Sequence, residues 1–158
     1  MRKTPRTTSA PKDTVTSLEF CLRLTRANAV MTNRLDRTLS SLHGLSFGDF
    51  MVLYHLSRAP EVRLRRIDLA HRMELTASGV TRTVLPLEKR GLVSRQEDPR
   101  DARIAFACLT KAGQRLLADA HTSAEQICQE LTQAVPSGGM DAIASILGKL
   151  AGINLTNT

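Results

Sequence analysis

Charged residues fill the segment EDPRDAR, residues 97–103, which lies between two partly apolar runs, GLVSRQ and IAFACL. Apolar runs on both sides of a turn that contains proline predict a β-hairpin, with strands at residues 92–96 and 103–110. The tip of this hairpin then carries Arg100 and Arg103. A guanidinium group binds phosphate or carboxylate oxygens through two parallel hydrogen bonds. The chemistry that this segment indicates is therefore recognition of an anion.

The whole chain is basic, with 22 Lys and Arg against 15 Asp and Glu and a net charge of +7. Such a charge favours a polyanionic partner, although a merely solvated basic surface has the same composition. Aromatic residues are only 3% of the chain, with no Trp and one Tyr. Proteins that bind single strands stack the bases on aromatic rings, so we expect a nucleic-acid partner to be a duplex.

The chain is 158 residues long, which is enough to bury one hydrophobic core. No apolar run approaches the roughly 18 residues that a transmembrane helix needs, so we expect no membrane partner. The three cysteines, Cys21, Cys108 and Cys128, lie far apart, and their odd number does not fit a disulfide framework. We therefore expect a reducing, cytoplasmic location.

Apolar periodicity and capping residues divide the chain into a series of elements. Gly44 and Gly91 are typical of helix ends, and Ser46, Thr76 and Thr110 are typical helix N-caps. The expected helices lie at residues 14–42, 47–57, 65–73, 77–90, 111–133 and 140–151, with an extended piece at 62–64 between the second and the third.

The order helix, turn, helix, hairpin is that of a winged helix-turn-helix, in which the second helix enters the DNA major groove. An arginine of the wing can then enter the narrow minor groove. The expected fold is mainly α with a small β-hairpin wing, an α+β class. We expect a disordered basic arm at residues 1–13, a helical dimerisation region at 14–45 and 111–158, and a DNA-binding lobe at 46–110.

The segment LTASGVTRTVLPLEKRGLVSRQEDPRDARIAFACLTKAGQRLL resembles the core signature of the MarR (multiple-antibiotic-resistance regulator) family. The resemblance covers residues 15–150 and is most specific at LTASGVTR, at LEKRGLV, and at DAR followed by LT. It implies that Arg103 is the minor-groove arginine of the family's D-x-R wing motif and that Asp101 orients it. Arg100 is an additional cation at the tip, and an ordinary turn charge is the alternative for it.

The resemblance also directs attention to the start of the fourth helix, which reads base edges. Arg82 has the reach for a bidentate contact with guanine. Arg65 and Arg66 are expected phosphate clamps and Arg95 a third, with a solvated arginine as the alternative for each. The expected DNA-contacting residues are Arg65, Arg66, Thr76, Ala77, Ser78, Gly79, Thr81, Arg82, Arg95, Arg100, Asp101 and Arg103.

Pro86 departs from the family pattern, because it falls inside the helix that reads the major groove. A proline there removes the hydrogen bond to the carbonyl of Arg82 and costs about 3 kcal/mol unless it is accommodated. We therefore predict a kink or bulge at residues 82–86.

The first helix and the last two contain more apolar surface than a small DNA-binding lobe can cover. An isologous interface between two copies would bury it, so we predict a homodimer that binds a pseudo-palindromic operator as a repressor. The resemblance implies a crevice for small phenolic or other anionic effectors. Its candidate lining residues, for which simple packing is the alternative, are Arg26, Asn33, Met51, Tyr54 and His55.

Cys21 opens a different hypothesis, a thiol-based peroxide sensor, because one subgroup of the family carries a reactive cysteine near the start of its first helix. The tyrosines that accompany that thiol are mostly missing here, since Tyr54 is the only tyrosine. An inert helix cysteine is the alternative.

Nothing in the sequence indicates an enzyme or a cofactor. It has no G-x-S-x-G and no G-x-x-x-x-G-K motif, and we assign no catalytic residue. The four histidines form no H-x-x-x-H pair and no C-x-x-C occurs, so we expect no metal site. A winged-helix module that binds another protein through its wing is a further alternative.

Overall fold

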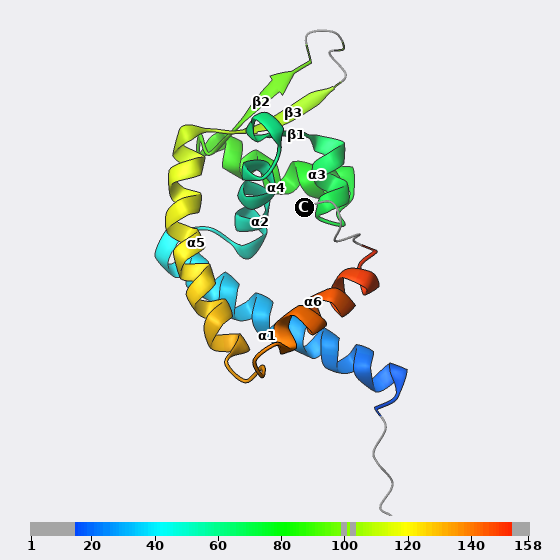
Figure 1. Ribbon diagram of the computed structural model, residues 1–158. Helices are drawn as coiled ribbons and strands as arrows, with labels where there is room; N and C mark the ends of the chain where they lie inside the picture. The colour runs from blue at the N-terminus through cyan, green and yellow to red at the C-terminus, as the bar shows by residue number, and fades with distance from the viewer. Residues whose placement is uncertain (1–14, 99–100, 102–103, 153–158) are drawn as a thin grey trace, which may run out of the picture.

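The computed structural model describes residues 15–98, 101 and 104–152. Most of these residues are helical, and a small antiparallel sheet lies at one end of the molecule (Figure 1). The fold class predicted from the sequence is confirmed. The elements are α1 (Ser17–His43), α2 (Phe47–Ser57), a 3-10 turn (Pro60–Val62), β1 (Arg63–Arg65), α3 (Arg66–Arg72), α4 (Ala77–Lys89), β2 (Val93–Glu97), β3 (Ala105–Leu109), α5 (Lys111–Thr132) and α6 (Gly139–Leu150). Within this part of the chain, no helix is both long and apolar enough to cross a membrane.

Local capping explains why the helices begin where they do. The hydroxyls of Thr16, Ser46, Thr76 and Thr110 each accept a hydrogen bond from the backbone N–H three residues later. Ser46 forms a complete capping box, because the Asp49 carboxylate also accepts from the Ser46 N–H at 3.0 Å. Such a cap stabilises a helix by about 1 kcal/mol. The three caps predicted from the sequence are confirmed.

The sheet has three strands in the order β1-β3-β2, all antiparallel. The extended piece predicted at residues 62–64 is therefore a full strand, shifted by one residue, whose central Leu64 pairs with Ala107. Both of these side chains are buried, so one face of the sheet packs on the core. A hairpin of two strands was predicted, and the third strand gives the wing a broader base.

The core lies within the winged helix-turn-helix lobe and along one side of α5. From α1 it receives only Leu35 and Leu39, which lie in the C-terminal half of that helix. Gly113 allows α5 to approach the start of β2 closely, because a Cβ atom at this position would lie 2.2 Å from the Leu92 carbonyl oxygen. No larger residue fits there without moving the backbone.

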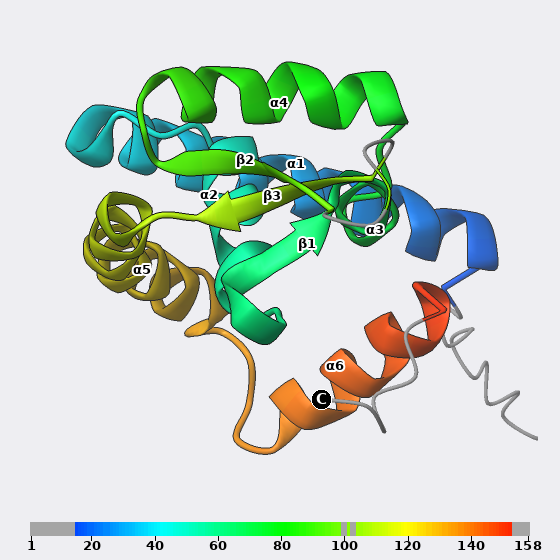
Figure 2. The same cartoon turned by 90° about the horizontal axis from the view of Figure 1, so that it is seen from above.

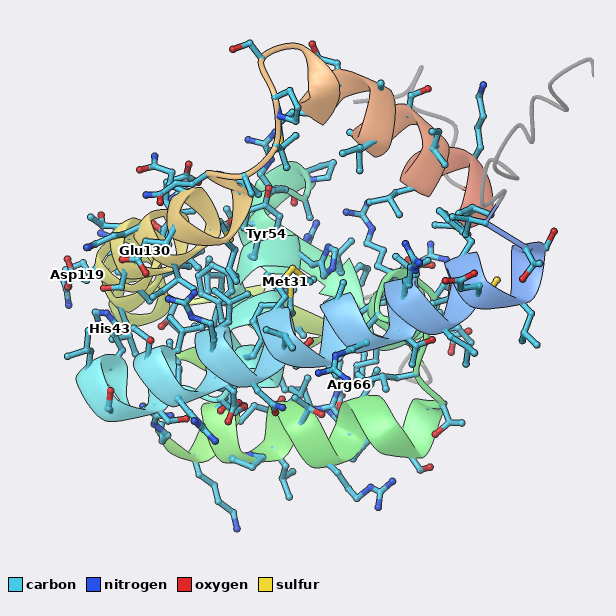
Figure 3. All side chains as sticks on the ribbon, turned by 90° about the horizontal axis from the view of Figure 1, so that it is seen from below. Met31, His43, Tyr54, Arg66, Asp119 and Glu130 are labelled. Carbon is cyan, nitrogen blue, oxygen red and sulfur yellow. The ribbon has the colours of Figure 1, made fainter. Side chains whose placement is uncertain are left out.

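Polar contacts hold the C-terminal half of α1 against the rest of the molecule. The His43 Nε2 atom lies 2.9 Å from the Ser123 hydroxyl on α5, and Arg34 forms an ion pair of 2.6 Å with Glu130 near the end of α5. Asp36 accepts a hydrogen bond of 2.8 Å from the backbone N–H of Phe47, at the start of α2. Figure 3 shows His43 and Glu130 on these facing surfaces.

The helix α4 runs through Pro86 without interruption, and every residue from Ala77 to Lys89 is α-helical. Figures 2 and 3 show it as one straight coil. The prediction of a kink or bulge at residues 82–86 is wrong. Pro86 lies on the exposed side of the helix, where water can bind the Arg82 carbonyl that loses its N–H partner. The neighbouring Val84 and Leu87 are buried and hold the helix on the core.

Two helical segments stand apart from this core. The N-terminal half of α1 and the whole of α6 extend beyond the lobe, and α6 is separated from it in both views (Figures 1 and 2). In α6 only Gly148 is buried. The exposed large apolar side chains of these two segments are Leu18, Phe20, Leu22, Val30, Met31, Met140, Ile143, Ile146, Leu147 and Leu150.

Candidate nucleic-acid interface

The helix α4 has one buried and one exposed face. Val80, Val84 and Leu87 pack into the core. The other side of its N-terminal half presents exposed polar and small residues, with Gly79 between the two faces. The Thr76 hydroxyl caps Gly79 and also meets the Ser78 hydroxyl at 3.1 Å. The exposed candidates predicted from the sequence are Thr76, Ala77, Ser78, Thr81 and Arg82, so the structure brings these five together on one surface.

The two predicted phosphate clamps of α3 differ from each other. Arg65 is the N-cap residue and is exposed to solvent. The Arg66 guanidinium instead points towards α4, where its Nη2 atom lies 2.6 Å from Glu88 Oε1 (Figure 3). The charge of Arg66 is therefore neutralised inside the lobe.

A groove of about 420 Å³ separates α3, α4 and β3. It lies beside the exposed surface of α4, since Ala77 and Thr81 form one of its walls. The Thr81 hydroxyl donates to the Ala77 carbonyl at 3.0 Å. The residues that line the groove are Arg65, Arg66, Ile67, Ala77, Thr81, Ile104 and Ala105.

In the wing, the structure describes residues 93–98, 101 and 104–109. The backbone N–H of Asp98 donates to the Ile104 carbonyl at 3.0 Å, and the Ile104 N–H donates to the Asp101 carbonyl at 2.9 Å. Arg95 lies on β2, exposed, 3.3 Å from Glu97. The predicted tip cations Arg100 and Arg103 lie outside the described residues, and of the D-x-R motif only Asp101 is described.

The sequence analysis missed Arg63, which lies on β1 and contacts both strands of the wing hairpin. Its guanidinium lies 4.9 Å from the centre of the Phe106 ring on β3, and its Nη1 atom donates to Gln96 Oε1 on β2 at 3.2 Å. It also forms an ion pair with Glu61. Arg63 thus connects all three strands, although its pairing partners on β2 and β3 lie too far along the chain for a sequence pattern to show them.

The LEKRGLV segment also carries contacts that the sequence analysis missed. Its Glu88 pairs with Arg66, as described above, and its Arg90 donates from Nη1 to the Gly44 carbonyl at 2.9 Å. Gly44 has a φ of 61° in the left-handed region and ends α1. Arg90 therefore links the end of α4 to the end of α1.

Comparison with known proteins decides the family. The profile of the MarR family matches residues 43–104. The HTH-type transcriptional regulator MhqR of Bacillus subtilis (strain 168) is 30% identical over 103 residues, which are 65% of this chain and 69% of that protein. This chain belongs to the MarR family of transcriptional regulators. A second relative, the uncharacterized HTH-type transcriptional regulator YdgJ of the same organism, is 26% identical over 107 residues, and the match covers 68% of this chain and 64% of YdgJ. The chain thus spans about two thirds of the length of these relatives.

Solved structures of MarR proteins share the fold. Sco3205 of Streptomyces coelicolor, a MarR family transcriptional regulator whose structure was solved in complex with DNA, superimposes with a TM-score of 0.79 at 26% identity, covering 87% of this chain and 92% of that one. CouR of Rhodococcus jostii RHA1, solved with bound p-coumaroyl-CoA, gives a TM-score of 0.78 at 23% identity, covering 92% and 99%. The family is one of transcriptional regulators, which agrees with the expectation that the chain is not an enzyme.

The five predicted effector residues lie in different surroundings. Arg26 borders an apolar groove of about 700 Å³ between α1, the end of α5 and α6, and the other four are not among its lining residues. Met51 and Tyr54 pack against the core, and the Tyr54 ring lies 6.5 Å from that of His121. Asn33 is exposed on α1. The effector site stays a prediction.

His55 is the predicted effector residue with the most unusual surroundings. Its Nε2 atom is buried without a hydrogen-bond partner in the described structure. Burial lowers the pKa of His55, and the positive charge of Arg72 lowers the pKa further. Both effects favour the neutral form of the imidazole.

The three thiols are free and differ in their surroundings. Cys21 is exposed on α1, and the cation nearest in sequence, Arg23, is already paired with Glu19. Burial raises the pKa of Cys108, partly opposed by Arg63, and burial together with Glu125 raises that of Cys128.

Among the described residues, no three His, Cys, Asp or Glu side chains cluster as metal ligands.

Proposed function

We propose that two copies of this chain form a repressor that binds a pseudo-palindromic DNA duplex, with α4 in the major groove and the wing in the adjacent minor groove. The observation that carries the proposal is the two-sided character of α4. Val80, Val84 and Leu87 on one side of it are fully buried, whereas its N-terminal half exposes hydroxyls and the Arg82 side chain on another side. A helix of this kind fits a major groove, where side chains at its N-terminal end contact base edges.

The distribution of charge supports the same geometry. Arg65, Arg82 and Arg95 are all exposed on the elements that flank or form the reading surface. The chain carries a net charge of +7, which favours a phosphate backbone as partner. Because it must reach chromosomal DNA, we further propose that the protein acts in the cytoplasm.

The proposal of a dimer rests on the apolar side chains that this chain leaves exposed on α1 and α6. Leu18 and Leu150, for example, are 69% and 59% exposed. Apolar patches formed by two helices mark interfaces in soluble proteins, and an isologous contact buries both copies of such a patch at once. A dimer also explains how two reading helices meet two half-sites about one helical turn apart.

The repressor is proposed to release DNA when it binds a small aromatic or acyl anion. The solved structure of CouR, which shares this fold, contains p-coumaroyl-CoA, and that of Bordetella bronchiseptica BpsR concerns regulation of its DNA binding by 6-hydroxynicotinic acid. Arg26, at the edge of the groove between α1, α5 and α6, is the cation best placed to meet a carboxylate. Release of a bound duplex by individual aromatic acids and acyl-CoA thioesters would test this part of the proposal.

The experiment that tests the main proposal is selection of duplexes from a random pool by the purified protein. The expected result is enrichment of an inverted repeat with half-sites separated by about 10 base pairs. Arg103→Ala should bind that duplex more weakly while keeping the circular dichroism of the wild type, and Arg37→Ala on α1 is the control. Unchanged affinity in Arg103→Ala would show that the wing assignment is wrong.

The peroxide-sensor alternative receives no support from the contacts of Cys21. Arg23, the cation nearest to it in sequence, is paired with Glu19, and the single tyrosine, Tyr54, lies on α2. Likewise, no contact among the described residues of the wing favours a protein-docking role over a role in DNA binding.

A further inference from the structure

Two neighbouring arginines at the start of α3 have opposite environments. The side chain of Arg66 is 20% exposed and pairs with Glu88, which is 18% exposed. The side chain of Arg65 is exposed and forms no hydrogen bond or ion pair within the described part of the chain. Only Arg65 is therefore available to an anion from outside, although both residues have the same chemistry and lie next to each other in the sequence.

The Arg66–Glu88 ion pair crosses between the two helices of the helix-turn-helix. It joins the first residue of α3 to the last turn of α4. An ion pair that is mostly shielded from water is stronger than one at the surface, and breaking it leaves an uncompensated charge. The Arg66 Nε atom is buried and has no hydrogen-bond partner, so the pairing with Glu88 leaves one donor of the guanidinium group unsatisfied. Glu88 is thus the group that holds it.

We propose that Arg66 is a positioning residue for DNA recognition. Its ion pair with Glu88 fixes the angle between α3 and α4, and this angle sets the shape of the groove between α3, α4 and β3. The sugar–phosphate backbone of one DNA strand lies in that groove, where Arg65 binds a phosphate. The inference rests on the proposed function, because it assigns a place to the strand that separates the major groove from the minor groove.

The chemistry of the groove matches this occupant. Among the described residues, those that line it include two arginines and no carboxylate. Ala77 and Ala105 leave room between the walls, and the exposed Ile67 offers an apolar surface to a deoxyribose ring. With Arg66 neutralised by Glu88, Arg65 is the lining residue whose charge faces the phosphates.

The test compares Arg65→Gln, Arg66→Gln and Glu88→Gln on the duplex that the wild-type protein selects, over a range of salt concentrations. In a dimer Arg65→Gln removes one phosphate contact from each copy, and at about 0.9 per contact this makes the plot of log K against log salt shallower by about 1.8. We expect this change for Arg65→Gln alone. Arg66→Gln should keep the wild-type slope and lose discrimination between the selected duplex and a scrambled one. Glu88→Gln should lose the same discrimination. Arg37→Gln, which removes a charge from α1, is the control and should change neither quantity.

Rescue variants separate positioning from simple loss of stability. The double variant Arg66→Glu/Glu88→Arg restores the ion pair and should recover discrimination, and Arg66→Lys, which keeps the charge, should recover part of it. A shallower salt slope for Arg66→Gln would make Arg66 a phosphate contact and overturn the inference. Wild-type discrimination in folded Arg66→Gln would overturn it as well. A wild-type protein that binds no duplex would instead overturn the proposed function.

Discussion

The winged helix-turn-helix lobe and the outer helical segments differ in how far their apolar side chains are buried within one chain. In the lobe, three strands and three helices enclose Leu53, Val80 and Leu87, which are fully buried. In the N-terminal half of α1 and in α6, residues with the same helical spacing remain exposed. The first region completes its core within one chain, whereas the second needs another surface. Periodicity alone shows that a helix has an apolar face, but not which molecule covers that face.

The largest effect is expected from truncating a side chain in the lobe. Leu53 is 0% exposed and Leu22, on α1, is 60% exposed. Leu53→Ala should lower the free energy of unfolding by about 2–5 kcal/mol, because it leaves a cavity in a closed core. Urea denaturation monitored by circular dichroism measures this. Leu22→Ala is the matched control, and an equal loss at that position, measured at protein concentrations too low for self-association, would contradict the contrast between the two regions.

The second prediction concerns the outer helices. Ile146→Glu places a charge among the exposed apolar residues of α6, and we expect it to weaken self-association by about 2 kcal/mol or more, about thirtyfold in the dissociation constant. Sedimentation equilibrium measures the change, with the helical circular dichroism of the lobe as a check on folding. Lys149→Gln, which changes the charge by the same one unit on the same helix, is the control for charge. A dimer of unchanged strength in Ile146→Glu would place the interface elsewhere.

The third prediction returns to the reading surface. Arg82→Ala should remove about 1–3 kcal/mol of discrimination at one base pair of each half-site, because a bidentate contact to guanine is lost. Competition with single-base variants of the selected duplex identifies the position. Lys89→Ala, at the other end of α4, should leave base discrimination unchanged. Equal relaxation at every position in Arg82→Ala would mean that Arg82 contacts phosphate.

The smallest effect is expected from His55. Its pKa is lowered in the folded protein by burial and by Arg72, so the unfolded chain binds a proton at a higher pH than the folded chain does. Stability should therefore be complete above the ordinary histidine pKa of about 6.5 and decrease as the pH falls below it. In His55→Gln this decrease should be smaller. Thermal unfolding of both proteins across the pH range in which histidine titrates measures the difference, and identical pH profiles would contradict the assignment.

Sequence reasoning located the elements well because their boundaries depend on local signals. Ser46, Thr76 and Thr110 cap their helices through bonds that span only three residues, and the bounds of α2 match the prediction. It failed at Pro86, where the burial of Val84 and Leu87 outweighs the local preference of proline. Tertiary packing of this kind is not visible in a local pattern.

The candidate site was predictable where exposure follows from helix periodicity and was not where it depends on distant partners. The exposed positions of α4 follow from the spacing of Val80, Val84 and Leu87. The partner of Arg66 lies 22 residues away, and the contact of Arg63 with Gln96 spans 33 residues. The tertiary fold determines which residues come within reach of such long side chains. A sequence pattern that predicts an arginine on the surface therefore does not predict what the arginine binds.

The most direct test of the central claim is sedimentation velocity of the purified protein, alone and with its selected duplex. The claim is that two copies join through α1 and α6 and present two α4 helices to one duplex. It predicts a dimer in the absence of DNA, and a complex of two chains on each duplex that dissociates as the salt concentration rises. Single chains that leave the sedimentation of the duplex unchanged, even at low salt, would contradict it.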